Sequence, residues 1–199
     1  MTDVPALHAW VDESTRRRAS GTSIYVLAAT VLDVEQADDA RRVVRELRLP
    51  RLRFLHWHEE SRDRRLQIAS AIAELDSLHT VVVGAPVDAT KPEKARALCL
   101  VRLATELASI RVEHMLFEGR TALQNRRDVA TIAELRSRRA IPHPLSVDFA
   151  GKGDDPMLWI ADIVAGAVGA SLTGIDPEPL DALGSSVEVI RIDLGRRKR

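Results

Sequence analysis

The sequence predicts an α/β fold in which helices cover a mixed β-sheet. Near the N-terminus, apolar runs at residues 7–11 and 24–32 flank a polar segment that contains a glycine, as in an antiparallel strand pair. Downstream, short runs rich in β-branched residues alternate with longer segments of helical spacing. An antiparallel pair followed by strand–helix units indicates a mixed sheet with helices on its faces.

The expected elements follow one another along the whole chain. A helix is predicted over residues 34–49, because apolar side chains recur there at helical spacing and Pro50 ends the pattern. The next segment, RLRFLHW at residues 51–57, is predicted to be a third strand. Further strands are expected at residues 80–87, 111–119, 144–149 and 187–192. Further helices are expected at residues 61–75, 91–110, 122–138 and 156–172.

The composition predicts one domain over residues 1–195, followed by a basic tail at residues 196–199. The 199 residues include 29 Lys and Arg and 29 Asp and Glu, so no net charge attracts the chain to nucleic acid or to an anionic membrane. The single cysteine, Cys99, argues against a disulfide framework and against cysteine-rich zinc modules. Because neither a membrane-spanning run nor a signal peptide is recognisable, we expect a cytoplasmic protein without a membrane partner.

Three acidic residues occupy positions where an unpaired carboxylate is costly. Asp12 follows the first predicted strand, on the side that it shares with Trp10, and Glu118 ends a later strand. Asp162 lies among apolar and small residues of the helix predicted over residues 156–172. A buried carboxylate is normally protonated, paired with a cation or bound to a metal. Asp12, Glu118 and Asp162 are therefore the candidate site residues.

Each of these residues also has an ordinary structural explanation. The first could belong to a turn, the second could pair with Arg120, and the third could pair with Arg111 or Arg126. Together, however, two carboxylates at the ends of adjacent strands and a third on a helix packed across them supply oxygen ligands suited to Mg²⁺ or Mn²⁺. Such a cluster can hold two ions about 3.5–4 Å apart, which activate water and stabilise a leaving oxygen.

Three segments of the chain resemble a family of ribonuclease H-like proteins that is catalogued as a domain of unknown function. They are WVDESTRRRASGTSIYVLAATVL, HWHEESRDRR and LWIADIVAGAVGAS. The family begins with an Asp-Glu-Ser strand and closes with an Ala-Asp-x-x-Ala-Gly helix. The resemblance implies a ribonuclease H-like mixed sheet flanked by helices. By analogy with nucleases of that fold, it also implies a metal-dependent phosphodiester hydrolase.

Carried over position by position, the resemblance assigns one role to each carboxylate. Asp12 would be the aspartate of the first strand, Glu118 the acidic residue of the later strand, and Asp162 the aspartate of the final helix. All three would then be catalytic residues and metal ligands. The chain departs from the family directly after Ser14, where Thr-Arg-Arg stands in place of a glycine.

Several further residues are candidates for accessory roles around this cluster. His56, with a second histidine two residues later, would bind a transition metal or transfer a proton, and the resemblance also places a histidine there. Glu13 is either an outer ligand or a residue that points to the opposite face of its strand. Asp148 precedes a GKGDD segment whose Lys152 could contact phosphate. Arg120 follows the second acidic strand end closely enough to pair with it.

The sequence therefore predicts a nuclease or a related phosphodiester hydrolase, with Mg²⁺ or Mn²⁺ as cofactor and nucleic acid as partner. Two other functions stay open. The balanced charge favours a catalytically inactive module of the same fold, as a homodimer or as part of a larger assembly. A small-molecule phosphoester hydrolase would share the metal site but would need a closed pocket. Basic runs at residues 16–18, 62–65 and 136–139 either follow a nucleic-acid backbone or form solvated surface.

Overall fold

The computed structural model describes residues 6–88, 90–141 and 145–195, and within these ranges six strands form one sheet in the order β5-β4-β1-β2-β3-β6. The strands are β1 (Leu7–Arg17), β2 (Ser23–Asp33), β3 (Leu78–Val87), β4 (His114–Glu118), β5 (Ser146–Ala150) and β6 (Val187–Asp193). β2 pairs antiparallel with both β1 and β3. β4 runs parallel to β1, β5 parallel to β4, and β6 parallel to β3. The predicted mixed sheet, with its antiparallel start, is confirmed.

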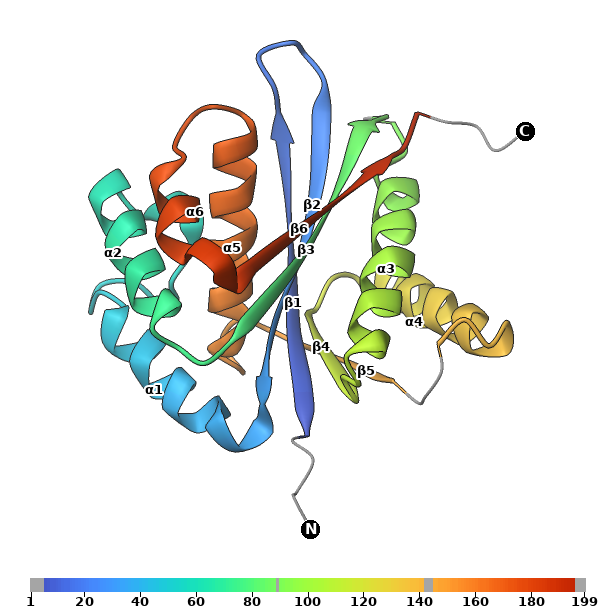
Figure 1. The fold of residues 1–199 in the computed structure, drawn as a ribbon, viewed down its shortest axis with the longest axis horizontal. Helices are drawn as coiled ribbons and strands as arrows, with labels where there is room; N and C mark the ends of the chain where they lie inside the picture. The colour runs from blue at the N-terminus through green and yellow to red at the C-terminus, as the bar shows by residue number, and fades with distance from the viewer. Residues whose placement is uncertain (1–5, 89, 142–144, 196–199) are drawn as a thin grey trace.

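Helices cover both faces of this sheet (Figure 1). They are α1 (Ala37–Leu47), α2 (Arg62–Ala73), α3 (Pro92–Ser109), α4 (Ala122–Ser137), α5 (Met157–Leu172) and α6 (Glu178–Leu183). Helices α1, α2, α5 and α6 share one hydrophobic core with the sheet, whereas α3 and α4 share another on the opposite face. None of the helices in the described ranges combines the length and the apolar character needed to cross a membrane.

The period-2 alternation of β1 determines which of its residues face the candidate site. Ala9 and Val11 belong to the core under α3 and α4, whereas Trp10 belongs to the core under α5. Asp12 therefore shares the face of Trp10, as the sequence predicted. Helix α5 is apolar on all sides, and every residue from Met157 to Ala170 is buried, so Asp162 is enclosed between α5 and the sheet.

The strand predicted at residues 51–57 is wrong. The segment is irregular and leads into a short 3-10 turn at Trp57–Glu59. The physical reason is a close approach: a Cβ atom on Gly166 would lie 2.2 Å from Cγ of Trp57, so the indole fills a space that only glycine leaves open. Packing of this side chain on α5, rather than strand pairing, fixes the conformation of the segment.

Two further expectations about the elements need correction. β1 does not end at Val11 but continues to Arg17, because β2 pairs with it along its full length. Asp12 is therefore a mid-strand residue. Helix α6 was not predicted, because its six residues between Pro177 and Gly184 are too few to show a helical period. The predicted strand start at Pro144 and the basic tail lie outside the described residues.

Candidate functional site

Three elements and one loop bring the predicted carboxylates around a single ammonium group. Val11 of β1 pairs with Phe117 of the parallel strand β4, which places Asp12 and Glu118 side by side. Asp162 reaches the same place from α5, and Lys152 reaches it from the loop after β5. Nζ of Lys152 lies 2.8 Å from Oδ1 of Asp162, 3.1 Å from Oδ2 of Asp12 and 3.5 Å from Oε2 of Glu118.

Asp162 is held in one orientation by three donors. Its Oδ1 accepts a hydrogen bond from Lys152, and its Oδ2 accepts one from the backbone N–H of Trp57 at 2.7 Å. Nδ1 of His56 lies 3.0 Å from the same Oδ2. Burial alone would raise the pKa of Asp162, but the hydrogen bonds and the charge of Lys152 lower it to about 2. The contact with Asp162 in turn raises the pKa of His56. Asp162 is therefore ionised at neutral pH.

Asp12 is the most deeply buried of the three carboxylates. Its Oδ1 accepts a hydrogen bond from the backbone N–H of Glu13 at 2.7 Å. Its Oδ2 is buried and lies 3.1 Å from Nζ of Lys152, an ion pair without a well-directed hydrogen bond. Burial raises the pKa of Asp12 well above its ordinary range, and the charges of Asp162 and Glu118 raise it further, against the opposing effect of Lys152. One ammonium group thus does not fully compensate the negative charge gathered here.

Lys152 is anchored through the backbone of its loop. Nε1 of Trp159 donates a hydrogen bond to the carbonyl oxygen of Lys152 at 2.7 Å. The N–H of Gly151 donates to Oδ2 of Asp154 at 2.8 Å. Burial lowers the pKa of Lys152, but the attraction of Asp12 and Asp162 outweighs burial and raises that pKa above its ordinary value. Lys152 is therefore a permanent cation at the centre of the carboxylates.

Glu13 and Arg120 lie in a second ion network on the opposite face of the sheet. Glu13 contacts the guanidinium of Arg96, which is fully buried and also pairs with Asp128 at 2.8 Å. Nη2 of Arg120 lies 3.2 Å from Oδ2 of Asp128, and its Nε lies 3.9 Å from Oε1 of Glu13. The sequence left two roles open for Glu13, an outer ligand of the site or a residue on the opposite face of the strand. The structure shows that it lies on the opposite face.

The other predicted accessory residues divide between the site and the surface. His56 contacts Asp162 and so belongs to the site, although it precedes a turn and does not lie on a strand. The side chain of Asp148 is 72% exposed, and its Oδ2 lies 3.8 Å from Nδ1 of His114. The structure does not bring Asp148 together with the carboxylates.

Sequence reasoning missed the central position of Lys152. The signal was present, because a Gly-Lys-Gly segment directly follows β5, and β5 pairs with the strand that carries Glu118. In the described residues, no three His, Cys, Asp or Glu side chains are grouped so that they could hold a metal ion by themselves. This result fits a cluster in which an ammonium group already stands between the carboxylates.

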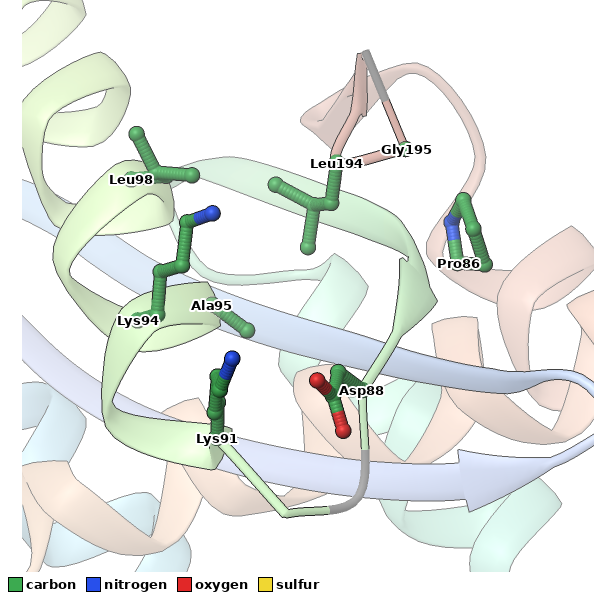
Figure 2. Close-up of a pocket in the computed structure, with 8 residues that line it drawn as sticks. All are labelled: Pro86, Asp88, Lys91, Lys94, Ala95, Leu98, Leu194 and Gly195. Carbon is green, nitrogen blue, oxygen red and sulfur yellow. The ribbon is translucent and has the colours of Figure 1, made fainter. Parts of the chain in front are cut away.

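A separate cavity of about 220 Å³ lies between the end of β3, the start of α3 and the segment after β6 (Figure 2). The ammonium groups of Lys91 and Lys94 and the carboxylate of Asp88 border it. None of the predicted site residues lines this cavity.

Comparison with solved structures defines the class of fold. The chain is similar to RNase HII of Archaeoglobus fulgidus, solved in a complex with PCNA, with 16% identity and a TM-score of 0.50 over 80% of this chain and 70% of that chain. It is similar to ribonuclease H2 of Pyrococcus horikoshii OT3, with 15% identity and a TM-score of 0.52 over the same shares. A mutant of Bst-RNase HIII matches with 17% identity and a TM-score of 0.50 over 83% of this chain and 52% of that chain.

These similarities show that the chain has a ribonuclease H-like fold. It spans about half the length of the RNase HIII chain. No family model matches the sequence, and no curated protein matches it either.

Proposed function

We propose that this chain is a divalent-metal-dependent phosphodiester hydrolase that acts on nucleic acid. Asp12, Glu118 and Asp162 are its catalytic residues and metal ligands in this proposal. The observation that carries it is the convergence of these three carboxylates, from β1, β4 and α5, on one cationic position. The likeness to RNase HII and RNase HIII supports a nuclease by analogy of fold.

The chemistry of the donor set fits Mg²⁺ or Mn²⁺. Carboxylate oxygens are the ligands these ions prefer, and the buried Oδ2 of Asp12 contacts the ammonium group of Lys152 without a well-directed hydrogen bond. A bound divalent ion supplies an activated water and stabilises the leaving oxygen. Asp12, Glu118 and Asp162 would hold the ion, and Lys152, which contacts an oxygen of each, would give up contacts with them.

The chain's own residues prepare the site for this exchange. His56 and the backbone of Trp57 hold Oδ2 of Asp162, which leaves Oδ1 directed at the centre of the cluster. The N–H of Glu13 fixes Asp12 in the same way through Oδ1. Lys152 stays tethered by its anchored loop, so its charge remains beside the site and attracts the phosphate of a substrate.

One observation favours a second function, a catalytically inactive module of the same fold. Lys152 already neutralises part of the carboxylate charge, and buried ion clusters of this kind also occur as purely structural features. In that case the protein would act by binding a partner, and the homodimer stays a prediction.

A cleavage assay with matched amide variants separates the two functions. Wild-type protein is incubated with single-stranded, duplex and RNA–DNA hybrid substrates in Mg²⁺ or Mn²⁺, beside Asp12→Asn, Asp162→Asn and the exposed control Asp148→Asn. We expect the wild type and the control to cleave, and both site variants to lose about 100-fold or more. Mn²⁺ should also raise the melting temperature of the wild type and of the control more than that of Asp162→Asn. No cleavage together with no stabilisation by Mn²⁺ would favour the inactive module.

A further inference from the structure

An arginine lies on the same face of β1 as Asp12, four residues further along the strand. Side chains four apart on a strand share a face, about 13 Å apart, so Arg16 extends the Asp12 face toward the β1–β2 hairpin. Its side chain packs on α5, because a Cβ atom on Gly169 would lie 2.9 Å from Cγ of Arg16. Gly169 lies two turns of α5 after Asp162, so Arg16 packs about 10 Å along the helix from that carboxylate.

Two of the three guanidinium nitrogens of Arg16 are buried without hydrogen-bond partners. Its Nε and Nη2 atoms are both shielded from solvent, and neither has a hydrogen-bond partner in the described part of the chain. Buried polar groups are almost always hydrogen-bonded, and those of a cation are the most costly to leave unpaired. Two unpaired donors on one guanidinium indicate a missing acceptor.

Two basic side chains act on Arg16 or are acted on by it, while Asp162 is the acidic group that acts on it. Arg65 lies over the ring of Trp57, with its Cζ 4.5 Å from the ring centroid, and its Nε donates to the carbonyl oxygen of Trp57. Burial and the charge of Arg65 lower the pKa of Arg16. Burial and the charge of Arg16 lower the pKa of His58. Arg16, His58 and Arg65 form a group that we call the basic cluster.

We propose that the basic cluster binds a phosphoryl group beside the carboxylate site. The proposal rests on the proposed function, since it assigns the place of a substrate phosphate next to the catalytic residues. Guanidinium groups match the oxygens of a phosphate in charge and in geometry, and an anion between Arg16 and Arg65 would relieve the repulsion within the cluster. The β1–β2 hairpin, which leads on from Arg16, projects beyond the other strands (Figure 1).

Binding without cleavage tests this proposal. Affinity for a labelled single-stranded oligonucleotide is measured in EDTA over a series of salt concentrations, for wild type, Arg16→Gln, Arg16→Lys and the control Arg17→Gln. Arg17 is exposed and points to the other face of β1. We expect Arg16→Gln to bind about tenfold or more weakly, and to lower the slope of log affinity against log salt by about 0.7. Arg17→Gln should match the wild type, and Arg16→Lys should keep the slope.

Inorganic phosphate, titrated into the same proteins, identifies the source of the phosphoryl group. Much tighter binding of the oligonucleotide than of phosphate assigns the cluster to a nucleic-acid backbone, whereas equal affinities assign it to small phosphates. In either case the binding must depend on Arg16. The proposal is overturned if Arg16→Gln binds both ligands like the wild type with an unchanged salt slope, or if the wild type binds neither. Binding in EDTA does not require a metal ion. A protein that binds in EDTA but never cleaves nucleic acid would therefore contradict the proposed hydrolase and still support the phosphate-binding cluster.

Discussion

Replacing Lys152 with methionine tests whether this lysine is the counter-ion of the carboxylate site. Its side chain is 11% exposed and contacts three carboxylates, with the nearest oxygens at 2.8 and 3.1 Å. Removing one partner of a buried ion pair costs about 3–5 kcal/mol, because the remaining charges are left uncompensated. Glu118 is one-third exposed, so solvent screens its share and the lower half of that range is expected. For a chain of this size, 3–4 kcal/mol corresponds to a melting temperature lower by about 6–16 °C.

The assay is thermal unfolding in EDTA and again with Mn²⁺, with Lys94→Met as the control. Lys94 is exposed at the rim of the cavity in Figure 2, so its loss removes a charge without touching the carboxylates. We expect Lys152→Met to melt well below this control in EDTA. Mn²⁺ should then stabilise it more than the wild type, because no ammonium competes for the oxygens. Each tenfold gain in Mn²⁺ affinity adds about 1.4 kcal/mol at saturation.

Two results would refute parts of this reasoning. If Lys152→Met unfolds at the same temperature as Lys94→Met in EDTA, the ammonium does not compensate the carboxylates. If the variant is destabilised but gains nothing from Mn²⁺, Lys152 is a structural ion-pair partner. The second result would favour the catalytically inactive module over the hydrolase.

Two further predictions concern stability. His79 is buried in β3, and burial lowers its pKa to about 4. Between about pH 6.5 and pH 4, the imidazole is therefore protonated in the unfolded chain and neutral in the folded chain. The free energy of unfolding should therefore decrease as the pH is lowered. Between pH 7 and pH 5, denaturant titrations should show a loss about 2 kcal/mol larger in the wild type than in His79→Gln. Equal losses in the two proteins would contradict this prediction. Gly166→Ala would force a methyl group into Trp57 and should cost about 1–3 kcal/mol, measured by chemical denaturation, whereas unchanged stability would mean that the indole can shift.

The fold could be predicted because its elements have distinct periods. The apolar run of β2 and the buried helix α5 are each long enough to be recognised, and the alternation in β1 placed Asp12 on its correct face. The errors fall where tertiary packing overrides local pattern. Trp57 belongs to a turn because Gly166 leaves space for its ring, and that contact joins residues more than 100 positions apart. No local pattern in the segment at residues 51–57 encodes it.

The candidate site could be predicted in part, for a similar reason. Carboxylates in apolar surroundings are conspicuous in a sequence, and the structure does bring Asp12, Glu118 and Asp162 together. A lysine in a loop is not conspicuous, because its long side chain can point in many directions. The anchored loop and the ion pairs with Asp12 and Asp162 hold the ammonium group at the site. The distance along the chain between Lys152 and Asp12 hides this contact from any reading of local sequence.

The consecutive residues Asp12 and Glu13 connect the two faces of the sheet. Neighbouring side chains on a strand point to opposite faces, so Asp12 enters the carboxylate site while Glu13 enters the network of Arg96 and Asp128. The same peptide unit also donates the N–H of Glu13 to Oδ1 of Asp12. Because the fully buried Arg96 holds the side chain of Glu13, it also fixes the backbone from which Asp12 projects. The Asp-Glu pair thus places one carboxylate in the candidate site and uses the other to keep it in position.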